Sequence, residues 1–243
     1  MPRKKHHVTF SNEMLTACQS AAMENAESLY KEAELLLEKK YYARAYFLAV
    51  ASIEETGKAA LAFNALGRKL NDSSVQSRLN VEFQDHHVKI QVAVIALYKA
   101  LCPAELRGEL QSIAHLQASL IHGREPSMYV GFNEAGELHV PNGVVSCTAA
   151  ADCVRLAKDC HSQTKKMLKN DKPYAFSDSQ DRLFALGKKA SKVWKEPDFH
   201  KYLLVVIENK NLNPDMLTTE IPAAIVDYYQ RYFCKGRKFE DRL

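Results

Sequence analysis

The stretch that decides the fold is residues 45–63, which read AYFLAVASIEETGKAALAF. Apolar side chains fill this run except at Glu54, Glu55 and Lys58 and at a few small polar positions. A run of this length, with no proline and no strand-like alternation, predicts a helix that is apolar almost all round. We expect this helix at about residues 41–66, as the central element of an all-helical protein.

Helical periodicity continues on both sides of this stretch. Apolar residues spaced three and four apart predict further helices at Asn12 to Lys39, Ser77 to Leu101, Ala104 to His122 and Cys147 to Leu168. Two short strands about a turn predict a β-hairpin at about 127–141. Amphipathic segments then follow at Ser179 to Lys195, Phe199 to Asn209 and Asp215 to Phe233. The sequence therefore predicts an all-α fold: an antiparallel helical bundle over 12–170 with a small β-hairpin insertion, and a C-terminal helical extension over 171–243.

Composition excludes several classes of protein. With 47% hydrophobic residues and only 9 glycines and 8 prolines in 243 residues, the chain is neither disordered nor an all-β sandwich. No apolar stretch approaches the roughly 20 residues that cross a bilayer, and the N-terminus lacks the apolar core of a secretory signal, so we expect a cytoplasmic protein without membrane contact. The 6 cysteines contain no Cys-x-x-Cys pair, so we expect neither a structural metal nor a cofactor.

Positive charge is concentrated late in the chain. The net charge is only +4, but residues 155–201 hold 12 Lys and Arg against 6 Asp and Glu, which is +6 and leaves −2 for the rest. Such a run is either a solvated helix surface or a surface that binds phosphates.

The charges inside the central helix are the most informative residues of the chain. Burying an ion costs several kcal/mol, so Glu54, Glu55 and Lys58 require partners or a function. Glu54 and Lys58 are four residues apart with the acid first, the favourable order for an intrahelical ion pair. We therefore expect these two side chains to pair.

A matching polar set lies on the next expected helix. Asp85 and Lys89 are also four residues apart, and His86 or its neighbour His87 can approach the central carboxylates. The two helices together predict an interlocking network of acids and bases. This network either fixes the register of the bundle or forms a binding or catalytic site.

Two familiar site motifs do not fit. The run from Ser52 to Ala59 superficially resembles a phosphate-binding loop, but Ser52 stands where the first glycine is needed and Ala59 where a magnesium-binding hydroxyl belongs. A dimetal bundle needs Glu-x-x-His, which Glu54, Glu55 and Asp85 do not provide.

Four segments, in this order, resemble the AbiV-type abortive infection proteins of bacterial phage defence. They are residues 25–37 (NAESLYKEAELLL), 42–58 (YARAYFLAVASIEETGK), 85–89 (DHHVK) and 124–130 (REPSMYV). This family is a branch of the HEPN superfamily of helical RNases and nucleotide-binding domains. The resemblance spans about residues 25–168 and implies a helical bundle that often works as a homodimer.

The resemblance also implies a site. Many HEPN proteins cleave RNA without a metal, using an Arg followed, after four to six intervening residues, by a His. Here Arg124 has Tyr129 where the His would fall, and a tyrosine with a pKa near about 10 is a poor base at neutral pH. Arg155 does have His161 at the expected spacing, although about one such pair is expected by chance in this chain.

Each of these residues has a structural interpretation beside the functional one. Arg124 follows an expected helix end, where it either contacts a ligand or caps the helix. Tyr129 is interpreted as a strand residue packing on the bundle rather than as an acid or base. His86 is either a member of the site or a buried, satisfied histidine.

We therefore expect an abortive-infection effector that arrests growth by acting on RNA or the translation machinery, through RNA cleavage or binding. The candidate catalytic residues are Arg124 and His86, or alternatively Arg155 and His161. The candidate binding residues are Glu54, Glu55, Lys58, Asp85, Lys89 and Tyr129. A phage-encoded protein is the expected activator. The competing hypothesis is a non-catalytic helical interaction module, or RNA- or nucleotide-binding scaffold, whose buried charges only hold its helices in register.

Overall fold

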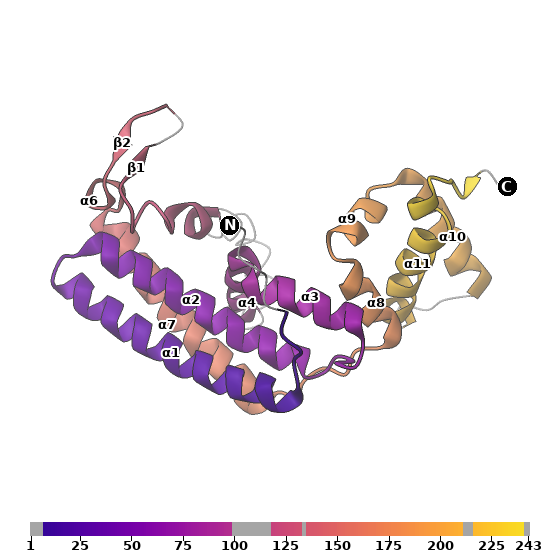
Figure 1. The fold of residues 1–243 in the computed structure, drawn as a ribbon, viewed down its shortest axis with the longest axis horizontal. Coiled ribbons are helices and arrows are strands. Elements are labelled where there is room, and N and C mark those ends of the chain that lie inside the picture. Colours follow the sequence, from indigo (N-terminus) through magenta and orange to yellow (C-terminus); the bar gives the residue numbers. More distant parts are fainter. Residues whose placement is uncertain (1–6, 99–117, 133–134, 211–215, 241–243) are drawn as a thin grey trace. The chain divides into compact units, whose positions relative to one another are not determined.

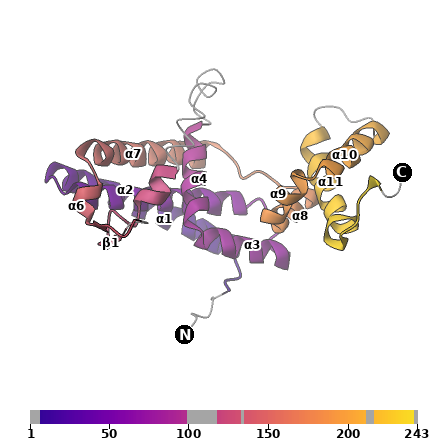
Figure 2. The same ribbon diagram turned by 90° about the horizontal axis from the view of Figure 1, so that it is seen from above.

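The computed structural model describes residues 7–98, 118–132, 135–210 and 216–240. The chain forms two compact units, which are described separately (Figures 1 and 2). One unit combines Ser11–Leu66 with Glu82–Pro173 and is called the bundle unit here. The other combines the residues up to Phe10 with Gly67–Val81 and Tyr174–Leu243 and is called the C-terminal unit.

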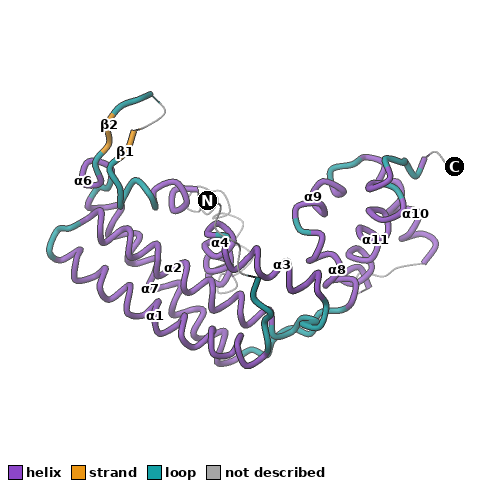
Figure 3. Tube along the Cα trace, viewed as in Figure 1, coloured by secondary structure: helices purple, strands orange, loops and turns teal. Residues whose placement is uncertain are grey.

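The bundle unit is built around one buried helix, as the sequence predicts. Helix α2 (Tyr42–Ala65) packs against α1 (Asn12–Glu38), α4 (His86–Tyr98) and α7 (Cys147–Asn170). The buried residues that α2 adds to the shared core are mostly alanines, and small side chains let several helices approach one axis. Helices, purple in Figure 3, make up most of the described part of this unit, so the all-α prediction is confirmed.

The expected single helix from Ser77 to Leu101 is wrong. The structure has two helices there, α3 (Ser73–Gln84) and α4, which are separated at Asp85. Asp85 Oδ1 accepts hydrogen bonds from the backbone N–H of His87 at 2.9 Å and of Val88 at 3.4 Å. These contacts cap the first turn of α4, so Asp85 starts a new helix instead of continuing the old one.

A short helical segment and the hairpin complete this unit. Residues 118–123 are helical, whereas the earlier part of the expected helix from Ala104 lies outside the described residues. Strands β1 (Gly131–Phe132) and β2 (Leu138–His139) pair antiparallel, which confirms the small hairpin. In Figure 1 the hairpin projects from the bundle beside α6 (Pro141–Val144).

The C-terminal unit is also helical. It contains α8 (Asp178–Leu186), α9 (Lys188–Trp194), α10 (Pro197–Lys210), α11 (Leu217–Arg231) and the 3₁₀ turn η2 (Phe233–Lys235). The expected helix from Ser179 to Lys195 is two helices, because Gly187 adopts a positive φ of 53° between them. Phe199, Tyr228 and Tyr232 form an aromatic core with Val193.

Buried acids hold this unit together. Asp198 accepts hydrogen bonds from the Tyr228 hydroxyl at 2.6 Å and from the backbone N–H of Phe239 at 2.7 Å. Asp181 pairs with Arg68, whose guanidinium also lies against the ring of Phe184. Residues 67–81 therefore belong to this unit. The predicted boundary between residues 170 and 171 had placed them in the bundle.

Within the described part of the chain, no helix combines the length and the apolar character that crossing a membrane requires.

Gly57→Ala is expected to destabilise the bundle unit by about 2 kcal/mol or more. The added Cβ would lie 1.9 Å from the backbone oxygen of Lys89, so α2 and α4 would have to separate. Urea denaturation measures the loss. Gly143→Ala is the control, because its Cβ meets only a Val140 methyl group at 3.6 Å. Equal stability of the two variants would contradict the close packing of α2 on α4.

Candidate functional site

A buried carboxylate joins three segments of the bundle unit. Glu54, on α2, is only 5% exposed. Its Oε2 lies 2.6 Å from His86 Nδ1 and 3.7 Å from Lys89 Nζ, both on α4. Its Oε1 lies 2.7 Å from Nε of Arg124, which follows the helical segment 118–123. These four residues are called the Glu54 cluster below.

The positions of α2 and α4 follow from small residues and caps. Gly57 lies one turn after Glu54, and its missing side chain lets the backbone of α4 approach at Lys89. The cap at Asp85 makes His86 the first residue of α4. The start of α4 and its next turn therefore face the Glu54 carboxylate.

Arg124 is held from both sides. The hydroxyl of the buried Ser127 donates a hydrogen bond to the Arg124 carbonyl at 2.6 Å, and Ser127 N–H donates to the Gly123 carbonyl at 3.1 Å. The Arg124 guanidinium carbon lies 5.6 Å from the centre of the Phe47 ring, on α2. The side chain therefore reaches back to the central helix.

The cluster carries more positive than negative charge. Lys89 and Arg124 both face Glu54, burial lowers the pKa of Lys89, and the charge of Glu54 opposes that shift. The Arg124 guanidinium also lies 4.0 Å from the carboxylate of the exposed Glu125. Arg124 Nε and Glu54 Oε1 are within ion-pair distance, but the N–H is not aligned with the oxygen, so neither buried atom makes a hydrogen bond. An anion beside Arg124 would therefore find an incompletely neutralised guanidinium.

A pocket opens next to the cluster. It has a volume of about 550 Å³ and is lined by the half-exposed His86 and the less exposed Arg124. Its other lining residues come from α3, α4 and the 118–126 segment: Gln84, Asp85, His87, Ile90, Ile121, His122, Glu125 and Pro126. We call this cavity the His86 pocket. Its lining combines the apolar Ile90, Ile121 and Pro126 with polar and charged side chains, which is the general make-up of small-ligand sites.

The expected intrahelical pairs are wrong. Lys58 pairs with Glu55, three residues before it, and not with Glu54. Asp85 caps α4, whereas the Lys89 side chain pairs with Glu54. The real network runs between segments because Glu54 faces the neighbouring helix.

Tyr129 lies outside the cluster and was interpreted wrongly. It precedes β1 rather than lying within a strand, and it is 61% exposed instead of packing on the bundle.

Arg155 and His161 are not brought together. Arg155 is exposed on α7 and pairs with Asp152 at 2.8 Å. His161 is buried on the same helix, where its ring centre lies 5.3 Å from that of Tyr30. The two side chains line different cavities, so their spacing in sequence does not correspond to a joint site.

Sequence reasoning missed part of the His86 pocket. Gln84, Ile121 and Glu125 line it but belong to no motif. The one available signal was the adjacency of His122 and Arg124 at a helix end.

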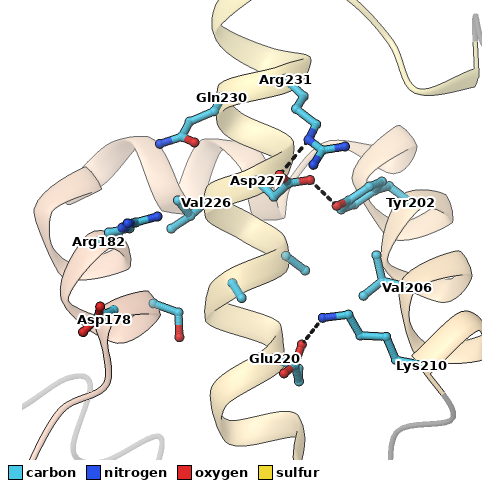
Figure 4. A pocket seen from close by; sticks show the side chains of 13 residues that line it. Asp178, Arg182, Tyr202, Val206, Lys210, Glu220, Val226, Asp227, Gln230 and Arg231 are labelled. Atoms are coloured by element: carbon cyan, nitrogen blue, oxygen red, sulfur yellow. Dashed lines mark hydrogen bonds and ion pairs between the residues drawn. The ribbon is translucent and has the colours of Figure 1, made fainter.

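A second cavity, of about 480 Å³, lies in the C-terminal unit and was not predicted (Figure 4). Most of its charges are already paired with one another. Asp227 contacts both Tyr202 and Arg231, and Lys210 contacts Glu220 (Figure 4). Because these charges neutralise one another, this cavity is a weaker candidate for an anion-binding site than the His86 pocket.

Among the described residues, no three His, Cys, Asp or Glu side chains are grouped so as to hold a metal ion.

Fold and site together define an all-α protein with an ion-paired polar site beside its central helix. The family model HEPN_AbiV, described as AbiV, matches residues 14–162. The match covers more than half of the chain and includes every residue of the Glu54 cluster, so the chain belongs to the AbiV family of HEPN abortive infection proteins. No curated protein and no solved structure matches it.

The burial of His161 predicts a pH dependence of folding. Burial lowers the pKa of His161 from its usual 6.5, with nearby Glu27 opposing the shift and Lys165 adding to it. Below pH 6.5 His161 is therefore protonated more readily in the unfolded chain than in the folded chain. The free energy of unfolding then falls as the pH is lowered toward about 5. His161→Asn is expected to flatten this part of the curve, measured by urea denaturation at a series of pH values.

His87→Asn is the control, because this histidine is exposed on α4. An unchanged pH curve for His161→Asn would show that His161 is not the buried titrating group.

Proposed function

We propose that this protein is an abortive-infection effector that interferes with translation by acting on RNA in the His86 pocket. The observation that carries the proposal is the line of contacts from Glu54 to His86 and Arg124 at the wall of one cavity. Family membership supports the role in abortive infection.

The imidazole of His86 is set up to accept a proton. A carboxylate can only accept a hydrogen bond, so the 2.6 Å contact to Glu54 requires the proton on Nδ1. In the neutral ring, Nε2 is then left as the basic atom. A carboxylate that orients an imidazole in this way also stabilises the imidazolium that forms on proton transfer.

RNA supplies the matching nucleophile. His86 Nε2 takes the proton from a ribose 2′-hydroxyl, the 2′ oxygen attacks the adjacent phosphorus, and the bond from phosphorus to the 5′ oxygen breaks. The Arg124 guanidinium donates to a non-bridging phosphate oxygen and stabilises its growing negative charge. The departing 5′ oxygen takes a proton from water, and the hydroxide that remains takes the proton back from His86 Nε2. The products are a 2′,3′-cyclic phosphate and a 5′-hydroxyl end.

RNA binding without cleavage is the second form of the proposal. Lys89 and Arg124 share the buried Glu54, and the other carboxylate beside Arg124, that of Glu125, is exposed and 4.0 Å away, so a phosphate can take its place. A bound RNA held there blocks translation without new ends. A homodimer, a phage-encoded activator and a cytoplasmic location remain predictions that accompany this role.

A purely structural role is the alternative, and one observation favours it: Glu54 is almost fully buried and ties three segments together. Such a carboxylate can hold the register of the bundle without any chemistry.

The test is induction of wild-type protein and two variants in bacterial cells, with growth and total RNA ends followed by sequencing. In His86→Asn the amide nitrogen replaces Nδ1 as donor to Glu54, but the basic Nε2 is lost. Arg124→Gln removes the guanidinium. Each substitution is expected to lower cleavage by about 100-fold or more.

Arg155→Gln is the matched control, because it removes an exposed arginine outside the cluster. Growth arrest with cyclic-phosphate ends that persist in both site variants would contradict the assignment of the site. Arrest with intact RNA would support binding over cleavage.

A further inference from the structure

Helix α9 of the C-terminal unit presents a group of unneutralised cations. Lys188, Lys189, Lys192 and Lys195 are all exposed. Within the described residues, none of the four ammonium groups lies at ion-pair distance from a carboxylate, whereas Lys201 and Lys210 in the same unit are paired. The positive charge of these four lysines is therefore not neutralised by a carboxylate among the described residues.

Helical spacing places most of these lysines on one face. Lys188, Lys192 and Lys195 are separated by four and three residues, so they share a stripe along α9 and its C-terminal cap. The fully buried Val193 anchors the opposite side of the helix in the core. Lys189 flanks the stripe and lies 5.8 Å from the centre of the Tyr229 ring.

The only tryptophan of the chain adjoins this stripe in sequence, between Val193 and Lys195. Trp194 is 47% exposed, although a large aromatic side chain gains most from burial. Its ring is supported by Phe199 and His200, each with a centre 5.8 Å away. The indole is therefore positioned by the core and still open to solvent.

We propose that Lys188, Lys189, Lys192, Lys195 and Trp194 form a binding surface for single-stranded RNA, called the α9 surface here. The lysines contact successive phosphates, and an unpaired base stacks on Trp194. A row of cations beside an exposed aromatic ring is how proteins hold single strands without reading their sequence. A duplex offers phosphates but keeps its bases stacked inside, so it gains only the lysine contacts.

The choice of RNA as ligand rests on the proposed function, but the residues do not. The α9 surface belongs to the C-terminal unit, and the Glu54 cluster belongs to the bundle unit. Binding at α9 and chemistry at Glu54 can therefore fail independently.

Because Trp194 is the only tryptophan, its fluorescence reports directly on stacking. Titration of the full chain with an oligouridylate of about 12 nucleotides is expected to quench the emission, with an affinity that falls steeply as salt is raised. The same sequence as a duplex with oligoadenylate is expected to quench far less.

Two variants test separately what the lysines and Trp194 contribute to RNA affinity, with fluorescence anisotropy of a labelled oligouridylate as the readout. The triple variant K188Q/K189Q/K192Q is expected to bind at least 10-fold more weakly. The control K166Q/K169Q/K172Q removes the same charge from the bundle unit and is expected to change affinity by less than about 2-fold. Trp194→Leu is expected to bind about 5-fold or more weakly, with a similar salt dependence.

Equal losses in the two triple variants would overturn the proposal, because they would reveal only general electrostatic attraction. RNA binding that leaves the Trp194 emission unchanged, or no binding at low salt, would also overturn it. If RNA is cleaved in a His86-dependent way while Trp194 stays silent, the α9 surface fails and the proposed function stands. If RNA quenches Trp194 but no effect in cells depends on His86, the α9 surface stands and the proposed function fails.

Discussion

The bundle unit depends on one buried negative charge. Glu54 has been taken out of water at the centre of the buried helix α2, and this cost is offset by contacts with His86, Lys89 and Arg124 from two other segments. The Asp85 cap sets where α4 begins, and the contacts of Glu54 with His86 and Arg124 tie the first turn of α4 and the chain after residue 123 to α2. Gly57 supplies the other half of the constraint, because α4 can approach Glu54 only where α2 lacks a side chain.

The same constraint creates a site. The contacts with Glu54 that join the segments also fix the orientation of the side chains that reach the surface, those of His86 and Arg124. His86 is half exposed although Glu54 is buried, so the carboxylate directs an imidazole that a ligand can reach. The structural and chemical interpretations of the network are thus compatible: the carboxylate sets the geometry, and the histidine and arginine at the pocket wall would act on the phosphate.

Much of the fold follows from local patterns, whereas the site does not. The buried helix α2, the hairpin and the helical C-terminal segments were predicted from periodicity and turn residues. Glu54, His86, Lys89 and Arg124 were all named as candidates, and the approach of His86 to a central carboxylate was predicted, but the partners of the lysines and of Arg124 were not. Lys58 has carboxylates both three and four residues before it, and only the direction in which Glu54 faces decides between them. The Glu54–Arg124 contact joins residues far apart in sequence, so it requires the folded chain.

Glu54 is the counter-charge that Lys89 and Arg124 require in the folded bundle. A double-mutant cycle with Glu54→Gln and Lys89→Met, measured by urea denaturation, tests it most directly. Glu54→Gln alone is expected to cost about 3–5 kcal/mol, because it leaves the buried Lys89 without a counter-charge and removes the nearest carboxylate from the partly exposed Arg124. Adding Lys89→Met to that variant is expected to restore about 1 kcal/mol or more, so the two effects are not additive. Additive effects, each below about 1 kcal/mol, would contradict the account.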